Sequence, residues 1–358
     1  KTKSAIGQMP LKSFSNISLT DDWQYGGFGV YIHWPFCAAK CPYCDFNSHV
    51  TSAVDEEDWR DAYVKEIDRT AQLTGLRGVN SIFIGGGTPS LMSPSLVGQL
   101  LDKIASVWQL ESNCEITLEA NPTALEAEKM WGFKASGVNR ISMGIQSLDD
   151  KDLKQLGRLH TVKEALKSFN MAQKVFERTS FDLIYARQNQ TLDEWKSELK
   201  QALNIGLSHI SLYQLTIENG TAFGDRYAAG KLSGLPDEDL ASDLFEITRE
   251  LCDSNGLPAY EVSNHARMGH ECRHNLIYWN YGDYAGIGPG AHGRLTLDQS
   301  RYSTETYRQP SKWLSEVKNG SGDSSVISLS YEDQGTEMVL MGMRLSRGIS
   351  IKRLQMFF

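Results

Sequence analysis

Three cysteines lie close together near the start of the chain, in residues 31–46, which read YIHWPFCAAKCPYCDF. Cys37, Cys41 and Cys44 have spacings of four and three residues, and such tight spacing lets one loop hold an iron–sulfur cluster. Three thiolates leave one iron of a four-iron cluster without a protein ligand. The sequence therefore predicts a cluster whose open iron receives a small exogenous ligand.

Zinc is the alternative metal, because His33 and His49 flank the three cysteines. Three cysteines and one histidine are a known structural zinc set. The chain has six cysteines in 358 residues, which fits a reducing compartment where thiols bind metal. Cys114 and Cys252 stand singly beside apolar segments and are predicted to fill the core.

Charge and hydropathy exclude two classes of protein. The formal net charge of −8 argues against a general nucleic-acid or membrane-surface binder, which would need a basic face. The sequence contains no run of about 18 apolar residues, which is the length that predicts a transmembrane helix. Residues 1–28 are predicted to form a disordered lead-in, with the remnant of a transit peptide as the alternative.

From Gly29 onward the pattern is strand, loop and helix, repeated six times. Alternation of this kind predicts a parallel sheet, because parallel neighbours need a helical crossover. Six units are too few for a closed eight-stranded barrel, so we expect an α/β fold with an open, curved barrel of six strands. The strands are expected at 29–33, 81–84, 115–118, 140–144, 181–184 and 210–215.

Polar residues follow several of these strands, where the carboxyl ends of parallel strands form one rim. Glu119, Gln146 and Asp182 are in this position, as are the cysteine loop and residues 85–89, which read GGGTP. The glycine run has no phosphate-binding Lys, so it is not a P-loop. Its glycines instead let the backbone approach a ligand closely.

The pattern C-x3-C-x2-C with an aromatic residue before the last Cys resembles the radical S-adenosylmethionine (SAM) superfamily. The resemblance implies a (β/α)6 partial TIM barrel, a [4Fe-4S] cluster on Cys37, Cys41 and Cys44, and SAM bound to the open iron through its amino and carboxylate groups. The matching SAM-binding positions are Tyr31, Tyr43, Gly86, Gly87, Thr88, Glu119, Gln146, Arg158 and Asp182.

One position separates two branches of this superfamily. The oxygen-independent coproporphyrinogen III oxidases carry a further Cys two residues after the third ligand, and this chain has Phe46 there. The signature YIHWPFC-x3-CPYCDF is similar to that of the HemW family of heme chaperones. Residues 182–188, DLIYARQ, depart from the family's common DLIYGLP, so the resemblance does not fix the loop there.

A second motif of that family, H-N-x-x-Y-W, matches His274, Asn275, Tyr278 and Trp279. The resemblance implies that these residues bind heme, and an imidazole is a common axial ligand of heme iron. Two alternatives stay open: His274 orients a loop from the core, or Cys272 supplies the ligand. His292, in the glycine-rich run 286–293, is expected to be structural or to border the SAM pocket.

The expected organisation is a lead-in over 1–28, the barrel over 29–235, an extension with the heme motif over 236–300, and the start of a small helical C-terminal domain over 301–358. The expected function is binding heme and passing it to an unidentified acceptor protein, in the cytoplasm or the mitochondrial matrix. The expected partners include no nucleic acid. Peripheral contact with membrane-bound hemoproteins is expected. The protein is expected to be a monomer or dimer. The rivals are a radical enzyme acting on a porphyrinogen and a zinc-bound structural protein.

Overall fold

The computed structural model describes residues 21–51 and 54–358. The predicted lead-in therefore lies mostly outside the described residues, which begin just before a short helix, α1 (Trp23–Gly26). Among the described residues, no helix combines the length and the apolar character needed to cross a membrane.

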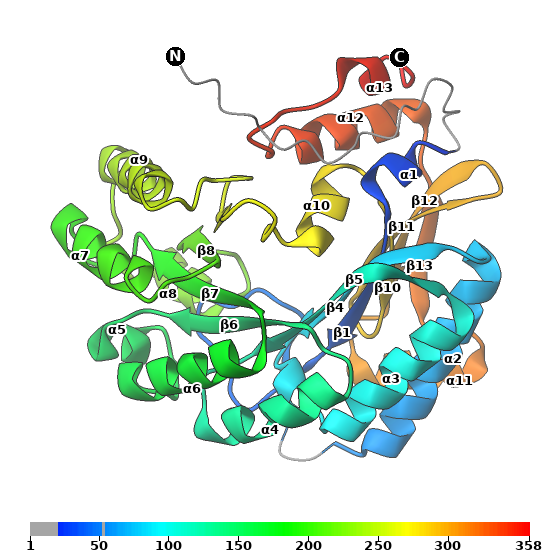
Figure 1. Cartoon of the computed structure of the whole chain (residues 1–358), viewed down its shortest axis with the longest axis horizontal. Helices are drawn as coiled ribbons and strands as arrows, with labels where there is room; N and C mark the ends of the chain where they lie inside the picture. The colour runs from blue at the N-terminus through cyan, green and yellow to red at the C-terminus, as the bar shows by residue number, and fades with distance from the viewer. Residues whose placement is uncertain (1–20, 52–53) are drawn as a thin grey trace.

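A single sheet of eleven strands runs through the molecule, in the order β13-β12-β11-β10-β1-β4-β5-β6-β7-β8-β9 (Figure 1). The six predicted strands are confirmed as parallel neighbours at its centre. They are β1 (Phe28–Trp34), β4 (Gly78–Gly86), β5 (Gln109–Ala120), β6 (Arg140–Gln146), β7 (Arg178–Tyr185) and β8 (His209–Gln214).

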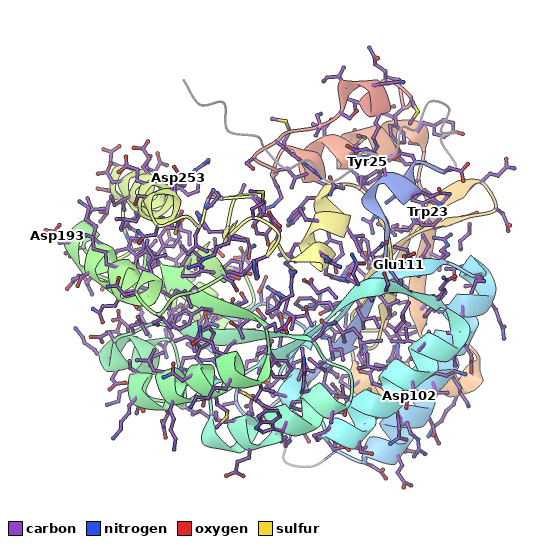
Figure 2. All side chains as sticks on the ribbon, viewed as in Figure 1. Trp23, Tyr25, Asp102, Glu111, Asp193 and Asp253 are labelled. Atoms are coloured by element: carbon purple, nitrogen blue, oxygen red, sulfur yellow. The ribbon has the colours of Figure 1, made fainter. Side chains whose placement is uncertain are left out.

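Helices cover the outer face of these strands, and side chains fill the space between the two layers (Figure 2). The helices of this part are α2 (Glu56–Thr74), α3 (Pro94–Val107), α4 (Ala124–Ala135), α5 (Asp150–Gln155), α6 (Val162–Val175), α7 (Leu192–Leu203), α8 (Ala222–Ala228) and α9 (Glu238–Ser254). Capping boxes at Thr161 and Thr191 begin α6 and α7: each threonine side chain accepts from the N3 amide, and the N3 glutamate accepts from the threonine amide. Ser93 caps α3 in front of Pro94.

The core lies between the sheet and these helices. Ile32, Ile84, Leu118 and Ile141 are fully buried on four neighbouring strands. A parallel sheet covered by helices buries much of both its faces, so its strands read as nearly continuous apolar runs. This burial fixes the strand ends, and with them the loops that carry the predicted site residues.

Five further strands extend the sheet at its two edges. Next to β1 lies a seventh parallel strand, β10, followed by three antiparallel strands, and β9 pairs antiparallel with β8 at the far edge. These strands are β9 (Asn264–Ala266), β10 (Asp283–Ile287), β11 (His292–Leu297), β12 (Ser300–Thr306) and β13 (Asp323–Ser328).

The C-terminal part is a mixture of strands and helices. The helices expected within 301–358 are present, but β12 and β13 also fall within this range and join the main sheet. These two strands were not predicted from the sequence. The C-terminal helices α12 and α13 lie beside α10, which carries the H-N-x-x-Y-W motif (Figure 1). These helices are α10 (Arg273–Trp279), α11 (Pro310–Asn319), α12 (Tyr331–Gly342) and α13 (Ile351–Leu354).

Candidate functional site

The cysteine loop connects two very short strands, β2 (Phe36–Cys37) and β3 (His49–Val50), which pair with each other beside the end of β1. The thiols of Cys37, Cys41 and Cys44 are all free. Cys37 is buried, and the other two are partly exposed. The loop therefore holds three thiols within one short turn of chain.

Donors from the barrel rim reach two of these sulfurs. The hydroxyl of Thr88 donates to Cys37 Sγ at 3.4 Å, and Nη1 of Arg158 donates to Cys41 Sγ at 3.4 Å. Hydrogen bonds and a nearby cation favour a thiolate over a thiol. Burial, together with the neighbouring thiols, raises the pKa of Cys37 and Cys44, so the thiolate form there depends on such partners and on a bound metal.

The zinc alternative would use the same thiols together with a histidine. Within residues 21–51 and 54–358, no three His, Cys, Asp or Glu side chains are gathered around one point as a single metal ion requires. A four-iron cluster accepts a wider arrangement, because each thiolate binds a different iron. His33, which a zinc site would use, has Nδ1 2.9 Å from the hydroxyl of Tyr31 and Nε2 2.9 Å from the carbonyl oxygen of Asn47.

The glycine run ends β4 and brings bare backbone against the cysteine loop. A Cβ added at Gly87 would lie 2.6 Å from the carbonyl oxygen of Phe36 and 3.0 Å from Cys37 Sγ. Gly86 has a φ of +111°, which favours glycine, and its amide donates to Glu119 Oε2 at 3.1 Å. Side chains are thus kept out of the space next to Cys37.

Two partly exposed carboxyl groups lie on neighbouring parts of the sheet: Glu119 is the last residue but one of β5, and Asp182 lies within β7. Burial and the neighbouring charge of Asp182 raise the pKa of Glu119 to about 7. Burial also raises the pKa of Asp182, which accepts hydrogen bonds from Ser142 at 3.2 Å and Ser180 at 3.0 Å. Two such groups on one rim can hold protons or accept hydrogen bonds from the hydroxyl and amino groups of a ligand.

Gln146 ends β6 in a left-handed conformation, with a φ of +74°. Its side-chain oxygen Oε1 is buried and has no hydrogen-bond partner within the described chain. Left-handed backbone is uncommon outside glycine, and an orphaned buried acceptor is costly. Both features fit a residue that completes its hydrogen bonds with a ligand, as the predicted SAM site requires.

Asn121 was missed by the sequence analysis. Its Nδ2 donates to the Thr88 hydroxyl at 3.2 Å, and its Oδ1 accepts from Arg158 Nη2 at 2.5 Å. Asn121 thereby connects the donor to Cys37 with the donor to Cys41. Its place two residues after Glu119, at the same strand end, was the available signal.

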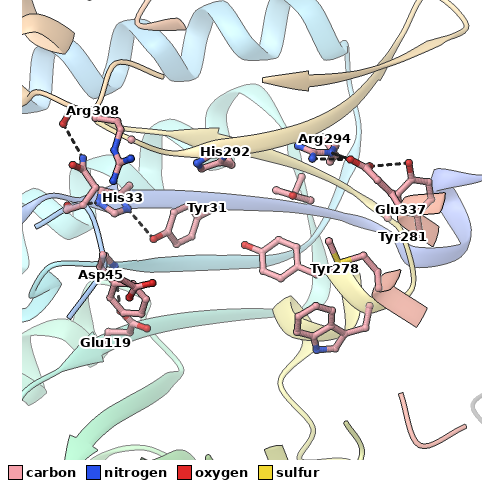
Figure 3. A pocket seen from close by; sticks show the side chains of 18 of the residues that line it. Tyr31, His33, Asp45, Glu119, Tyr278, Tyr281, His292, Arg294, Arg308 and Glu337 are labelled. Carbon is pink, nitrogen blue, oxygen red and sulfur yellow. Dashed lines mark hydrogen bonds and ion pairs between the residues drawn. The ribbon is translucent and has the colours of Figure 1, made fainter. Parts of the chain in front are cut away.

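A cavity of about 470 Å³ opens beside the ends of β1, β4 and β5. Figure 3 shows the Tyr278 hydroxyl pointing toward Tyr31, with His292 and Arg294 on a strand alongside. Five of the predicted site residues line this cavity: Tyr31, Gly86 and Glu119 from the SAM set, and Tyr278 and Trp279 from the heme set. Its size falls within the usual range for small-molecule and cofactor sites, about 300–1,000 Å³.

The rest of the wall comes from strands and helices that follow the barrel. The exposed ring of Phe46, the residue in place of the oxidases' further Cys, lies at the cysteine-loop end. The wall also includes three arginines and several aromatic or titratable residues: Tyr281, Tyr284, His292, Arg294, Arg301, Arg308 and Glu337. The cavity therefore joins the predicted SAM end to an aromatic and arginine-rich end.

His274 does not line the cavity. Its ring is buried, with Nδ1 2.6 Å from the hydroxyl of Ser81 and Nε2 2.7 Å from the hydroxyl of Tyr278. Burial and the charge of Arg140 lower the pKa of His274 to about 3, so the ring is neutral. In this arrangement neither nitrogen is free for an iron, and the ligand role of His274 requires one hydrogen bond to break.

The other residues predicted around the motif also lie outside the cavity. Asn275 is partly exposed on α10. Cys272 is buried just before the helix, with Sγ 3.6 Å from Glu115 Oε1, and burial raises its pKa to about 12. A thiol of this kind stays protonated, which makes Cys272 a poor alternative ligand.

Comparisons with known proteins give the family. Residues 31–202 match the radical SAM superfamily. "Radical S-adenosyl methionine domain-containing protein 1, mitochondrial" of Bos taurus is 39% identical over 334 residues, which are 92% of this chain and 75% of that protein. "Heme chaperone HemW" of Escherichia coli is 42% identical over 274 residues, 76% of this chain and 71% of that protein.

One solved structure has the same fold along nearly the whole chain. Coproporphyrinogen III oxidase (HemN) from Escherichia coli superposes with a TM-score of 0.79 at 20% sequence identity, covering 95% of this chain and 80% of that one. This likeness extends the shared fold to the strands and helices beyond the barrel. The matches in sequence show that the chain belongs to the radical SAM superfamily, in the family that includes the proteins named heme chaperone HemW.

Proposed function

We propose that this protein is a heme chaperone, which binds heme in the cavity described above and transfers it to an acceptor protein. The observation that carries the proposal is the continuity of that cavity. One space is bordered by Gly86 and Glu119 at the cysteine-loop end and by Tyr278 and Trp279 at the other. Relatives at about 40% identity named as heme chaperones support the same function.

The cysteine-loop end is assigned to the resident cofactors. Cys37, Cys41 and Cys44 would hold a [4Fe-4S] cluster, and SAM would lie over Gly86, Gly87 and Thr88. The family's cluster supplies an electron and an open iron coordination position when bound. Arg158 beside Cys41 and the orphaned Gln146 Oε1 are the best-supported polar contacts for SAM.

The other SAM contacts proposed from the resemblance have less direct support. Tyr31 and Glu119 border the cavity, and Asp182 lies close enough to Glu119 to raise its pKa. Tyr43 lies beside Cys41 and Arg158, and burial raises the pKa of its hydroxyl. Burial raises the pKa of each of these four groups, which favours the protonated form that can donate to an oxygen or nitrogen of SAM.

The far end is suited to a flat, apolar ring. Tyr278 and Tyr284 pack edge to face with ring centroids 4.5 Å apart, and Tyr278 also packs against Trp279 at 6.3 Å. Aromatic faces supply apolar contact area with little conformational freedom to lose. His274 contributes by holding Tyr278 through its hydrogen bond, and Asn275 belongs to the same helix.

Anaerobic heme titration of the cluster-loaded protein, with and without SAM, tests the proposal. We expect stoichiometric heme binding and transfer of the heme to a heme-free acceptor hemoprotein, followed by the absorption spectrum of the acceptor. Absence of heme binding in both conditions contradicts the proposal.

The same material decides against the rival radical enzyme. Reduced protein is incubated with SAM and coproporphyrinogen III, and 5′-deoxyadenosine and protoporphyrinogen IX are measured. We expect neither product at an enzymatic rate, because Phe46 replaces the further Cys of the oxidases. Formation of both products at such a rate would assign the protein to catalysis instead.

Compartment and partners follow from the same proposal. The relatives comprise bacterial heme chaperones and proteins named as mitochondrial, so the cytoplasm or the mitochondrial matrix is proposed. The acceptor is proposed to be a hemoprotein, including membrane-bound ones reached from the surface. The protein is proposed to act as a monomer or dimer without nucleic acid.

A further inference from the structure

Two histidines, His33 and His292, line the cavity, and they differ in what their rings contact. Both ring nitrogens of His33 are engaged, by the hydroxyl of Tyr31 and the carbonyl oxygen of Asn47. The side chain of His292 is 61% exposed, and Nδ1 lies 3.6 Å from Glu305 Oε1. Its Nε2 has no partner within the described part of the chain.

The strand geometry aims His292 at the cavity. His292 begins β11 and lies directly opposite Glu305 on the antiparallel strand β12. Side chains alternate along a strand, so His292 and Arg294 share one face, whereas Leu295 on the other face is buried in the core. Figure 3 shows His292 and Arg294 on the same strand, next to the space that Tyr278 and Tyr31 border.

Glu305 stands where a carboxylate partner of a metal-binding histidine is usually found. A histidine ligand commonly directs its second nitrogen at a carboxylate, which fixes the ring and raises its basicity. The Nδ1 contact of His292 with Glu305 leaves Nε2 as the nitrogen that is open to a metal.

Three arginines line the same cavity, and two of them are already occupied. Arg294 makes a two-pronged ion pair with Glu337, with the closest atoms 2.8 Å apart. Arg301 is buried and donates to the carbonyl oxygens of Tyr281 and Gly282.

Arg308 is the third. It is exposed, and its guanidinium has no hydrogen bond or ion pair among the residues that the structure describes. Its backbone is held in place, since its carbonyl oxygen accepts from Asn47 Nδ2 at 2.8 Å. A cation at the open edge of an aromatic cavity is suited to a carboxylate, because a guanidinium binds carboxylates with two parallel hydrogen bonds.

We propose that His292 ligates the heme iron through Nε2 and that Arg308 binds a carboxylate on the edge of the heme. This inference rests on the proposed function and identifies two contacts within that site. The apolar edge of the ring then faces Tyr278, Trp279 and Tyr284, and the carboxylate edge faces solvent at Arg308. The assignment moves the iron ligand from His274, whose nitrogens are both bonded, to the histidine with a free one.

The test of His292 compares heme with protoporphyrin IX, which has the same ring and carboxylates but no iron. In His292→Ala, we expect a shifted heme spectrum and heme affinity at least about tenfold weaker, while protoporphyrin IX affinity changes less than about twofold. Added imidazole should restore the wild-type spectrum in this variant. His270→Ala is the matched control, because His270 is partly exposed and does not line the cavity.

The test of Arg308 compares heme with heme dimethyl ester, which lacks free carboxylates. In Arg308→Ala, we expect heme affinity about fivefold weaker, and the loss should shrink as salt is added. The affinity for the ester should be the same in the variant and the wild type. Arg267→Ala, which removes an exposed arginine away from the cavity, is the control and should behave as wild type.

The outcomes separate this inference from the proposed function. If the wild type binds heme and His292→Ala keeps the wild-type spectrum and affinity, the ligand assignment is wrong and the chaperone function stands. Equal loss of heme and protoporphyrin IX in His292→Ala, without rescue by imidazole, gives His292 a structural role and also overturns the assignment. Failure of the wild type to bind heme at all overturns both proposals.

Discussion

The imidazole Nε2 of His274 lies 2.7 Å from the hydroxyl oxygen of Tyr278, one turn further along α10. The other ring nitrogen lies 2.6 Å from the hydroxyl of Ser81 on β4. These two contacts tie the helix with the H-N-x-x-Y-W motif to the centre of the barrel. They also give His274 a role that needs no metal.

Tyr278→Phe separates that role from iron ligation. The variant removes the partner of Nε2 and leaves a buried nitrogen unsatisfied, so we expect the free energy of unfolding to fall by about 1–2 kcal/mol. If His292 is the ligand, the heme spectrum stays unchanged. His274 would have lost its hydrogen bond to Tyr278 in this variant. A heme absorption spectrum that shifts toward stronger histidine ligation would show that His274 then binds the iron.

Tyr284→Phe is the matched control for this variant. Its hydroxyl, also on the cavity wall, has no hydrogen bond among the described residues, and its ring packs against Tyr278. We expect the free energy of unfolding to change by less than about 0.5 kcal/mol. A loss as large as that of Tyr278→Phe would mean that the His274 contact does not account for the effect.

Glu119→Gln should stabilise the protein more at high pH than at low pH. The pKa of Glu119 is raised from 4.5 to about 7, so the folded state holds a proton that the unfolded chain releases. The wild type therefore gains stability as pH falls from 7 toward 4.5 and loses it as pH rises through 7. Gln cannot ionise, so the variant does not lose stability in this way as the pH rises.

Urea unfolding of the cluster-free protein at pH 8 and pH 5 measures the difference. We expect the free energy of unfolding of Glu119→Gln to exceed that of the wild type by about 1–3 kcal/mol at pH 8, with most of the excess gone at pH 5. Glu128→Gln, on the exposed side of α4, should show little difference at either pH. An excess that is larger at pH 5 would contradict the prediction.

Removal of one cysteine from the loop should abolish the cluster. In Cys41→Ala, two of the three proposed ligands remain, and we expect the iron content after anaerobic reconstitution to fall to the background level. Cys114→Ala is the control, because this variant also removes one thiol. Cys114 is buried away from the loop. Full iron content in Cys41→Ala would exclude the assigned ligand set.

The central strands were predictable from the sequence because helices cover them, and buried apolar residues such as Ile82, Ile84, Ile116 and Leu118 recur along them. The outer strands are different. β13 is mostly exposed, and β12 mixes buried and exposed polar residues, so neither gives an apolar run. Their place depends on pairing, of β12 with β11 and of β13 with β12, and this pairing is a property of the folded chain that leaves little trace in local sequence.

The same contrast applies to the candidate site. The cysteines, the glycine run and Glu119 follow strands in a recognisable pattern, so their place on one rim could be predicted. The occupied nitrogens of His274 could not, because Ser81 is 193 residues away in the chain. Nor could the cavity wall at Arg308, which follows β12, a strand that was not predicted from the sequence. For His292, the sequence left open a structural role or a place at the border of the SAM pocket.

The closeness of the glycine run to the cysteine loop leads to the last prediction. In Gly87→Ala, the new Cβ would lie 2.6 Å from the carbonyl oxygen of Phe36 and 3.0 Å from Cys37 Sγ, so the backbone of the loop must shift. We expect a stability loss of about 1–3 kcal/mol and reduced iron content, measured by urea unfolding and iron analysis.

Gly98→Ala, in the middle of α3, is the control. Its Cβ would lie 3.4 Å from Ser136 Oγ, and the helix should gain up to about 1 kcal/mol. Wild-type stability and iron content in Gly87→Ala would mean that the loop is loose enough to move, and that Gly87 does not define the space beside Cys37.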